Sequence, residues 1–170
     1  MSKDKVPSTP AILTLKTRHA DFSVHPYPYE ERGGTRSSAR KLGVDEHCVI
    51  KTLVMEDETG RPLMILMHGD REVSTKTLAR ALGVKTILPC KPEVAHKHTG
   101  YLVGGTSPFG LKKAIPIYME KTIADLPTIY INAGARGLLA AMHPHELVRI
   151  LEPVLVSVAI EICLLRKNKS

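Results

Sequence analysis

Short apolar runs separated by turn-forming residues extend along the whole chain. Five segments combine helical spacing with terminal signals, such as Thr9 before Pro10 or Gly43 and Gly83 after a last turn. They predict helices at residues 10–18, 35–43, 74–83, 91–100 and 143–151. β-rich runs predict strands at 22–29, 84–90, 114–120 and 128–134, and a hairpin over 48–69 with its turn at 57–60. The apolar run at 154–162 fits either a strand or a helix.

The order of these elements predicts the fold class. Helices and strands are interspersed, without regular βαβ units or an internal repeat, which favours an α+β fold with a mixed, largely antiparallel sheet. At 170 residues the chain is most simply one domain spanning 1–170. Residues 160–170 are expected to form a frayed or accessory tail.

Charge and composition narrow the range of partners. The chain carries 24 Lys and Arg against 17 acidic residues, a net charge of +7, which fits either a solvated basic surface or a polyanionic partner. Aromatic residues make up only 4% and Trp is absent, so a base-stacking surface for single-stranded nucleic acid is disfavoured.

The cysteines and the terminal segments indicate a cytoplasmic protein. Cys48, Cys90 and Cys163 are odd in number and far apart, which favours a reducing compartment over a disulfide framework. The first ten residues contain no apolar signal segment, and the run 154–165 is too short to cross a bilayer. We expect no membrane association.

A glycine-rich segment at residues 99–113 is the main candidate site. It is not a phosphate loop of the P-loop type, because Leu111 occupies the position of the phosphate-binding lysine. Nor does Ser107 fit a nucleophile elbow, since Pro108 favours an extended conformation at Ser107. The segment can instead expose the amides of Gly104, Gly105 and Thr106 to a carbonyl oxygen or a phosphate. The alternative is a tight turn, although a turn needs only one or two glycines.

Two cationic residues are further candidates. Lys51 lies in an apolar strand that we expect to be buried on both faces, so its ammonium either reaches water at the sheet rim or has a polar role. Arg136, between Gly134 and Gly137, lies in an expected loop after the strand at 128–134, where it can meet an anion or remain solvated.

Metal and thiol chemistry are disfavoured. His96 and His98, like His143 and His145, fall in expected helices where residues i and i+2 do not face each other, and no carboxylate cluster accompanies them. Cys48 is expected to be an inert buried thiol. We expect no metal and no cofactor.

Three segments in order, "KTLVM", "TGYLVGGTSPFG" and "TIYINAGARG", resemble the YbaK/EbsC family of aminoacyl-tRNA deacylases, whose domain also occurs as the editing insertion of bacterial prolyl-tRNA synthetases. The likeness extends from the first expected helix to about Leu151. It implies a sheet curled into a barrel-like core and metal-free hydrolysis of the ester between a mischarged amino acid and the 3′-terminal adenosine of tRNA. Cys-tRNA(Pro) is the implied substrate, with the substrate thiol as the attacking group and prolyl-tRNA synthetase as a partner.

The resemblance also assigns roles to residues. Lys51 matches the essential lysine of the family, and Gly104 and Gly105 match its pocket loop, so these three are the catalytic candidates. Substrate binding is expected at Thr52, Gly100, Tyr101, Thr106, Ser107, Pro108, Gly134, Arg136 and Gly137. Asn132 and Ala133 replace small residues of many members and are expected to trim the pocket. Two alternatives remain open: editing of Ala or Ser, and a non-catalytic nucleotide- or RNA-binding module.

Overall fold

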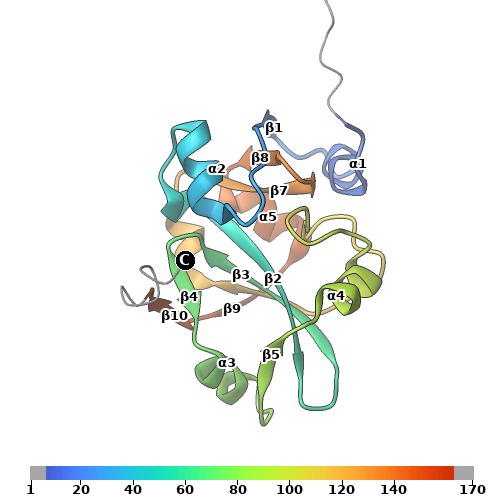
Figure 1. The fold of residues 1–170 in the computed structure, drawn as a ribbon, viewed down its shortest axis with the longest axis vertical. Coiled ribbons are helices and arrows are strands. Elements are labelled where there is room, and N and C mark those ends of the chain that lie inside the picture. Colours follow the sequence, from blue (N-terminus) through green and yellow to red (C-terminus); the bar gives the residue numbers. More distant parts are fainter. Residues whose placement is uncertain (1–6, 163–170) are drawn as a thin grey trace, which may run out of the picture.

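The computed structural model describes residues 7–162 as an α+β fold (Figure 1). The helices are α1 Pro10–Thr17, α2 Gly34–Leu42, α3 Thr75–Leu82, α4 Pro92–Thr99 and α5 Pro144–Leu151, with 3-10 helices η1 Glu46–Cys48 and η2 Lys121–Asp125. The strands are β1 Phe22–Pro26, β2 Val49–Asp57, β3 Pro62–His68, β4 Arg71–Val73, β5 Ile87–Pro89, β6 Ile117–Glu120, β7 Ile129–Ala135, β8 Leu138–Met142, β9 Val154–Val156 and β10 Ala159–Glu161.

The main sheet has the strand order β1-β8-β7-β2-β3-β6-β9, and β5 also pairs with β2. Most neighbours are antiparallel, but β2 runs parallel to β7, β3 to β6, and β6 to β9. A mixed, largely antiparallel sheet is therefore confirmed. The pairings of the described residues leave β1 and β9 as the ends of an open path, so barrel-like curling stays a prediction.

Local sequence signals explain the helix boundaries. The Thr9 hydroxyl accepts a hydrogen bond from the Ile12 N–H, and Ser74 caps α3 in the same way. Gly43 and Gly83 adopt the left-handed conformation after α2 and α3, as expected for glycine at this position. The five expected helices and the 48–69 hairpin are confirmed.

The structure corrects one expectation about the strands and contains two strands that the sequence did not predict, β8 and β4. Residues 131–137 are not a loop after a strand: β7 continues to Ala135, and a tight turn leads into β8, which the sequence did not predict. β8 reads Leu-Leu-Ala-Ala-Met and is buried throughout, so it lacks the polar alternation typical of a half-exposed strand. The run at 154–162 forms the two short strands β9 and β10, and β10 pairs with β4, which was also missed.

Residues 160 and 161 are therefore not frayed, because they pair with Glu72 and Arg71 of β4. The rest of the expected tail, from residue 163 onward, lies outside the described residues. No helix within residues 7–162 is long and apolar enough to cross a membrane.

Three apolar clusters hold these elements together in the described residues, and the smallest packs α2 on β2 and β8 through Ala39, Val49 and Leu139. The largest one packs α1 and α5 on the sheet through buried residues such as Leu15, Ile131 and Leu147. The second packs α3 and β5 on β3 through Leu78, Ile87 and Ile65. The sheet is thus supported by one cluster near β7 and β8 and by another near β5.

Glu120 is a buried carboxylate that joins the end of β6 to the β9–β10 turn. Its Oε2 atom accepts hydrogen bonds from the N–H groups of Val158 at 2.7 Å and Ala159 at 3.0 Å, and the residue is 2% exposed.

We predict that Glu120→Ala lowers the free energy of unfolding by about 2–3 kcal/mol, because two N–H groups lose a charged acceptor. Urea denaturation measures this loss. The exposed Glu31→Ala is the matched control and should change stability by less than about 0.5 kcal/mol. Equal stability of the two variants would contradict the assigned role of Glu120.

Candidate active site

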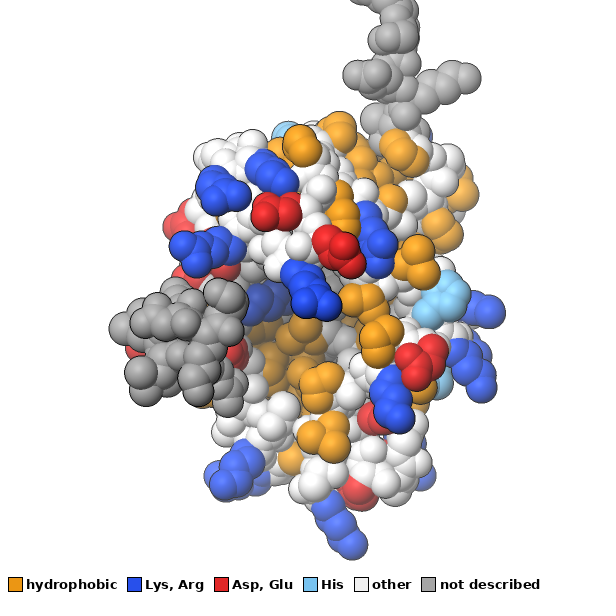
Figure 2. All heavy atoms as spheres, in the orientation of Figure 1, with side chains coloured by type: hydrophobic (Ala, Val, Ile, Leu, Met, Phe, Trp, Pro, Cys, Tyr) orange, Lys and Arg blue, Asp and Glu red, His pale blue; other side chains and the backbone are white. Residues whose placement is uncertain are grey.

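An interruption in strand pairing opens a cleft along β2. One edge of β2 pairs with β7 only at Val49 and Ile50, and with β5 only from Met55 to Asp57. Within the part of the chain that the structure describes, no strand pairs with this edge between those two contacts. A cleft of about 720 Å³ lies there, lined by residues 49–55, and Figure 2 shows this hollow with apolar walls and cationic side chains at its rim.

Lys51 lies in this interrupted stretch and lines the cleft. It is half-buried, and the expectation that its strand is buried on both faces is wrong for residues 51–54, which have intermediate exposure. The Lys51 ammonium donates a hydrogen bond to the Arg71 carbonyl at 2.8 Å. Since an ammonium has three N–H bonds, two remain available for a ligand.

The charge state of Lys51 is set by opposing effects. Burial lowers the pKa of the Lys51 ammonium below its ordinary value, because desolvation disfavours the charged form. Carboxylates partly offset this reduction in the pKa; they belong to Glu46, Glu72 and Asp70. The site thus contains a cation that is only partly solvated and whose electrostatic interactions are stronger than in water.

Thr52 also lines the cleft, although its side chain points to the opposite face of β2. The Val54 carbonyl accepts the Cys90 N–H on the interrupted edge, so the N–H and C=O of Thr52, two residues earlier, point to the same edge. The Thr52 hydroxyl oxygen is buried and has no hydrogen-bond partner among the described residues. The interrupted edge therefore offers main-chain donors and acceptors beside the Lys51 ammonium.

The β7–β8 hairpin fixes the glycine loop at the other side of the cleft. The Asn132 Nδ2 group donates to the Gly104 carbonyl at 3.1 Å, and the Arg136 Nε group donates to the Val103 carbonyl at 3.0 Å. Arg136 also lies over the Tyr29 ring, 5.4 Å from its centroid. Two successive peptide groups of the loop are therefore held through their oxygens.

The amides of the loop differ from the expectation at one position. The Gly105 N–H donates to the Leu102 carbonyl at 2.8 Å, so the prediction that it is exposed for a ligand is wrong. Within residues 7–162, the N–H groups of Gly104 and Thr106 have no protein acceptor, and both residues line the cleft.

Gly105 is needed for a close approach. A Cβ atom at this position would lie 3.0 Å from the Arg136 nitrogen and 3.1 Å from the Ala135 carbonyl carbon. Gly104 has a φ of +88°, which favours glycine.

The structure brings five of the predicted site residues together and places the others behind them. Lys51, Thr52, Gly104, Thr106 and Arg136 line the cleft. The remaining seven do not line it; they are Gly100, Tyr101, Gly105, Ser107, Pro108, Gly134 and Gly137.

These seven residues support the loop and the hairpin. The Tyr101 hydroxyl donates to the Phe109 carbonyl at 2.6 Å, the Ser107 hydroxyl accepts from the Phe109 N–H, and Gly100 ends α4 in the left-handed conformation. Burial raises the pKa of Tyr101 to about 12, so its phenol stays protonated. Direct contact of these residues with a substrate is not supported by their positions.

Sequence reasoning missed one wall of the cleft. Tyr27 and Tyr29, after β1, and Thr35 and Ser37 of α2 line it, as does Cys90 after β5. Burial raises the pKa of the Cys90 thiol to about 11, so it is protonated at neutral pH. The "PYPY" segment was a usable signal, since its prolines end β1 at Pro26 and leave both tyrosines outside the strand.

The histidine pairs form no metal centre in the described residues, where no group of three possible ligands occurs. The expectation that the histidines of each pair face apart is wrong for the second pair. His143 precedes α5 in an extended conformation, and its ring contacts that of His145 with centroids 4.2 Å apart.

A sequence profile of the aminoacyl-tRNA editing domain matches residues 31–150, a range that contains the cleft-lining strand, the loop and the hairpin. The chain belongs to this family. Its YbaK/EbsC resemblance is confirmed by a proposed Cys-tRNA(Pro)/Cys-tRNA(Cys) deacylase, EbsC, of Enterococcus faecalis, which is 29% identical over 152 residues, covering 88% of this chain and 93% of EbsC. The proline–tRNA ligase of Moorella thermoacetica is 38% identical over 96 residues, which cover 56% of this chain but 16% of the ligase.

Solved structures share the fold of this editing domain. A proposed trans-editing enzyme for prolyl-tRNA synthetase superposes with a TM-score of 0.79 at 22% identity, over 91% of this chain and 99% of the other. The hypothetical protein APE2540 superposes with a TM-score of 0.81 at 22% identity, over 89% of this chain and 99% of the other.

We predict that Gly105→Ala separates the loop of the editing domain from the β7–β8 hairpin and destabilises the protein by about 1–3 kcal/mol, since the added methyl group meets backbone atoms. Amide chemical shifts should change at Arg136 and Asn132. Gly60→Ala is the control: Gly60 has open space around it but a φ of +80°, so the added methyl group strains only its own turn and should change shifts only there. Unchanged hairpin shifts in Gly105→Ala would show that the contact is not needed.

Proposed function

We propose that this editing domain is an aminoacyl-tRNA deacylase that acts in trans and removes Cys from mischarged Cys-tRNA(Pro) without a metal ion. The observation that carries the proposal is that Lys51, Gly104 and Thr106 line one cleft, in a chain of this family. The similarity to EbsC along most of both chains supports the choice of Cys.

The chemistry of an aminoacyl ester fits a site of this kind. The ester already has a good leaving group, so stabilising the oxyanion of the tetrahedral intermediate provides much of the catalysis. One well-placed donor is typically worth about 2.7–4 kcal/mol. In the proposal, the amides of Gly104 and Thr106 face this oxyanion, and Lys51 binds the terminal adenosine or the ester carbonyl.

The substrate supplies the attacking group. The cysteine sulfur attacks its own ester carbonyl, the bond to the 3′ oxygen breaks, and that oxygen takes the thiol proton. The amino acid leaves as a cyclic thiolactone. Support for this route is that the two described cysteines are poor nucleophiles, because burial raises the pKa of both the Cys48 and the Cys90 thiol.

The basic net charge supports weak, salt-sensitive attachment of the tRNA body. Choice among tRNAs is proposed to come from prolyl-tRNA synthetase as a partner. This part of the proposal is supported by relatives that are proline–tRNA ligases containing a similar segment. We also propose that the protein is cytoplasmic, as a substrate in translation requires.

We predict that Lys51→Ala abolishes deacylation of Cys-tRNA(Pro) while the fold stays intact, because the substrate loses its cationic contact. The measurement is release of labelled amino acid from a panel of Cys-, Ala- and Ser-charged tRNA, with circular dichroism as the check on folding. Addition of EDTA should leave the rate unchanged.

The panel also separates the alternatives. Equal rates on Ala-, Ser- and Cys-tRNA would refute assistance by the substrate thiol, and preference for Ala or Ser would replace the assigned specificity. Binding of charged tRNA without any release of label would identify a binding module instead of an enzyme. Full turnover by Lys51→Ala would remove Lys51 from the site.

A further inference from the structure

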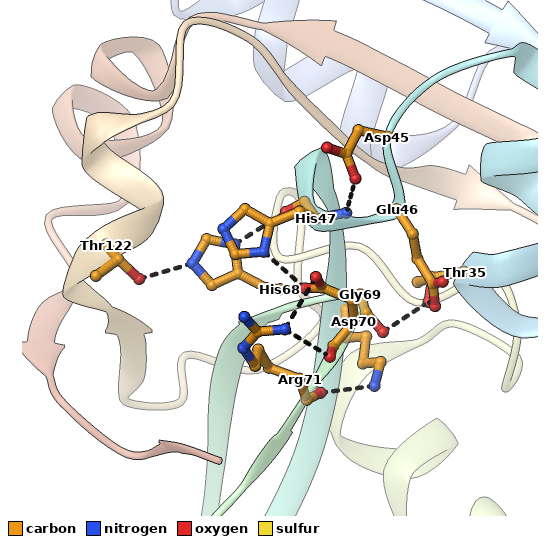
Figure 3. Close-up of polar contacts among 10 residues, drawn as sticks. Thr35, Asp45, Glu46, His47, His68, Gly69, Asp70, Arg71 and Thr122 are labelled. Carbon is orange, nitrogen blue, oxygen red and sulfur yellow. Dashed lines mark hydrogen bonds and ion pairs between the residues drawn. The ribbon is translucent and has the colours of Figure 1, made fainter. Parts of the chain in front are cut away.

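The Lys51 ammonium is held by a main-chain oxygen whose own position depends on a polar network. The Arg71 carbonyl that accepts from Lys51 belongs to the first residue of β4, directly after the turn at Gly69 and Asp70. Figure 3 shows that side chains from η1, β3, η2 and this turn converge behind Arg71. His47, His68 and Asp70 do not line the cleft.

Asp70 is the central member of this network. One carboxylate oxygen accepts from His47 Nδ1 at 2.7 Å, and the other accepts from the Arg71 guanidinium at 3.0 Å (Figure 3). Burial raises the pKa of Asp70. The hydrogen bond and charge of His47 and the charge of Arg71 together lower this pKa by more, so it lies below its ordinary value. Asp70 is thus ionised at neutral pH and binds both donors at once.

The turn that carries Asp70 is tightly packed against the surrounding backbone. A Cβ atom on Gly69 would lie 2.6 Å from the Glu46 carbonyl oxygen and 2.7 Å from that of Val49. The Thr35 hydroxyl lies 3.2 Å from both the Gly69 carbonyl and the Glu46 carboxylate, and its single proton can serve either. The turn is therefore packed against η1 and α2.

His68 supports His47 from the core side. It is 1% exposed, and its ring stacks on that of His47 with centroids 3.8 Å apart. Its Nδ1 atom lies 2.9 Å from the His47 carbonyl, which can only accept, so Nδ1 carries the proton and Nε2 accepts from the Thr122 hydroxyl at 2.7 Å. Burial lowers the pKa of His68, in agreement with a neutral ring.

We propose that Asp70 is a positioning residue for Lys51: by tying Arg71 to His47, it fixes the carbonyl that orients the Lys51 ammonium along the cleft. The proposal rests on the proposed function only in that Lys51 is taken to contact the substrate. In Asp70→Asn, the amide NH₂ replaces one acceptor and opposes one of the two donors. The turn at Gly69 and Asp70 then loses one of the two hydrogen bonds that Asp70 accepts, and the Lys51 side chain can move toward the carboxylates of Glu46 and Glu72 instead.

The test measures the full chain in two ways. Steady-state deacylation of Cys-tRNA(Pro) gives kcat and KM, and an NMR titration of the Lys51 side-chain signal, assigned with Lys51→Arg, gives its pKa. We expect Asp70→Asn to lower kcat about tenfold, because a small displacement of a reacting group has a large effect on rate. KM should stay within about twofold of the wild-type value.

The same variant should lower the pKa of Lys51, since a nearby negative charge is lost. Asp125→Asn removes an exposed carboxylate and is the matched control; it should change neither quantity. His47→Ala removes one of the two donors but keeps the Asp70 charge, so it should lower kcat by a smaller amount and change the Lys51 signal without lowering the pKa of Lys51. It replaces Asp70→Asn if circular dichroism shows that the latter does not fold.

The two arms separate the two proposals. An unchanged Lys51 signal and an unchanged kcat in the Asp70 and His47 variants would overturn the positioning role, whatever Lys51→Ala does. If Lys51→Ala retains full turnover while Asp70→Asn still shifts the Lys51 signal, the proposed function of Lys51 fails and the coupling to Asp70 stands. A loss of kcat with an unchanged Lys51 signal would assign Asp70 to general stability and also overturn the proposal.

Discussion

The incomplete pairing of one strand edge determines where this molecule can bind a ligand. β2 has a continuous neighbour in β3 on one side, while its other side is shared by β7 at one end and β5 at the other. An unpaired strand edge exposes N–H and C=O groups that need partners. Here the open stretch is short and lies between two paired ends, so it forms the floor of a cleft and not a surface for aggregation.

This gap also explains how a lysine can occupy an apolar strand. Before the interruption, β2 is buried at Val49 and Ile50. Within it, a long side chain can leave the sheet and reach a carbonyl of β4 while its ammonium stays next to the cleft. The Lys51 ammonium keeps the Arg71 carbonyl as a hydrogen-bond acceptor. Because it is partly desolvated, its interaction with an anionic or carbonyl ligand is stronger than in water.

The sequence predicted local structure better than long-range pairing. Caps, left-handed glycines and a hairpin turn are encoded by neighbouring residues, so the helices and the 48–69 hairpin were found. β8 and β4 were missed because β8 lacks the alternation of a half-exposed strand, and the three residues of β4 acquire strand structure by pairing with the distant β10. The same limit applies to the site. Lys51 and the glycine loop were visible as motifs, whereas Tyr27 and Tyr29 reach the cleft only because β1, which precedes them, pairs with the distant β8.

The roles of the glycines show why motif and mechanism have to be separated. All of Gly100, Gly104 and Gly105 belong to one string of sequence, yet only Gly104 lines the cleft. Gly100 ends a helix, and Gly105 lets the loop touch the hairpin. Because Arg136 holds the Val103 carbonyl oxygen, the Gly104 N–H on the other side of that peptide group can remain without a protein partner at no cost in loop order. A donor that is held rigid in the absence of ligand needs no reorganisation when charge develops, and this is the property that an oxyanion site requires.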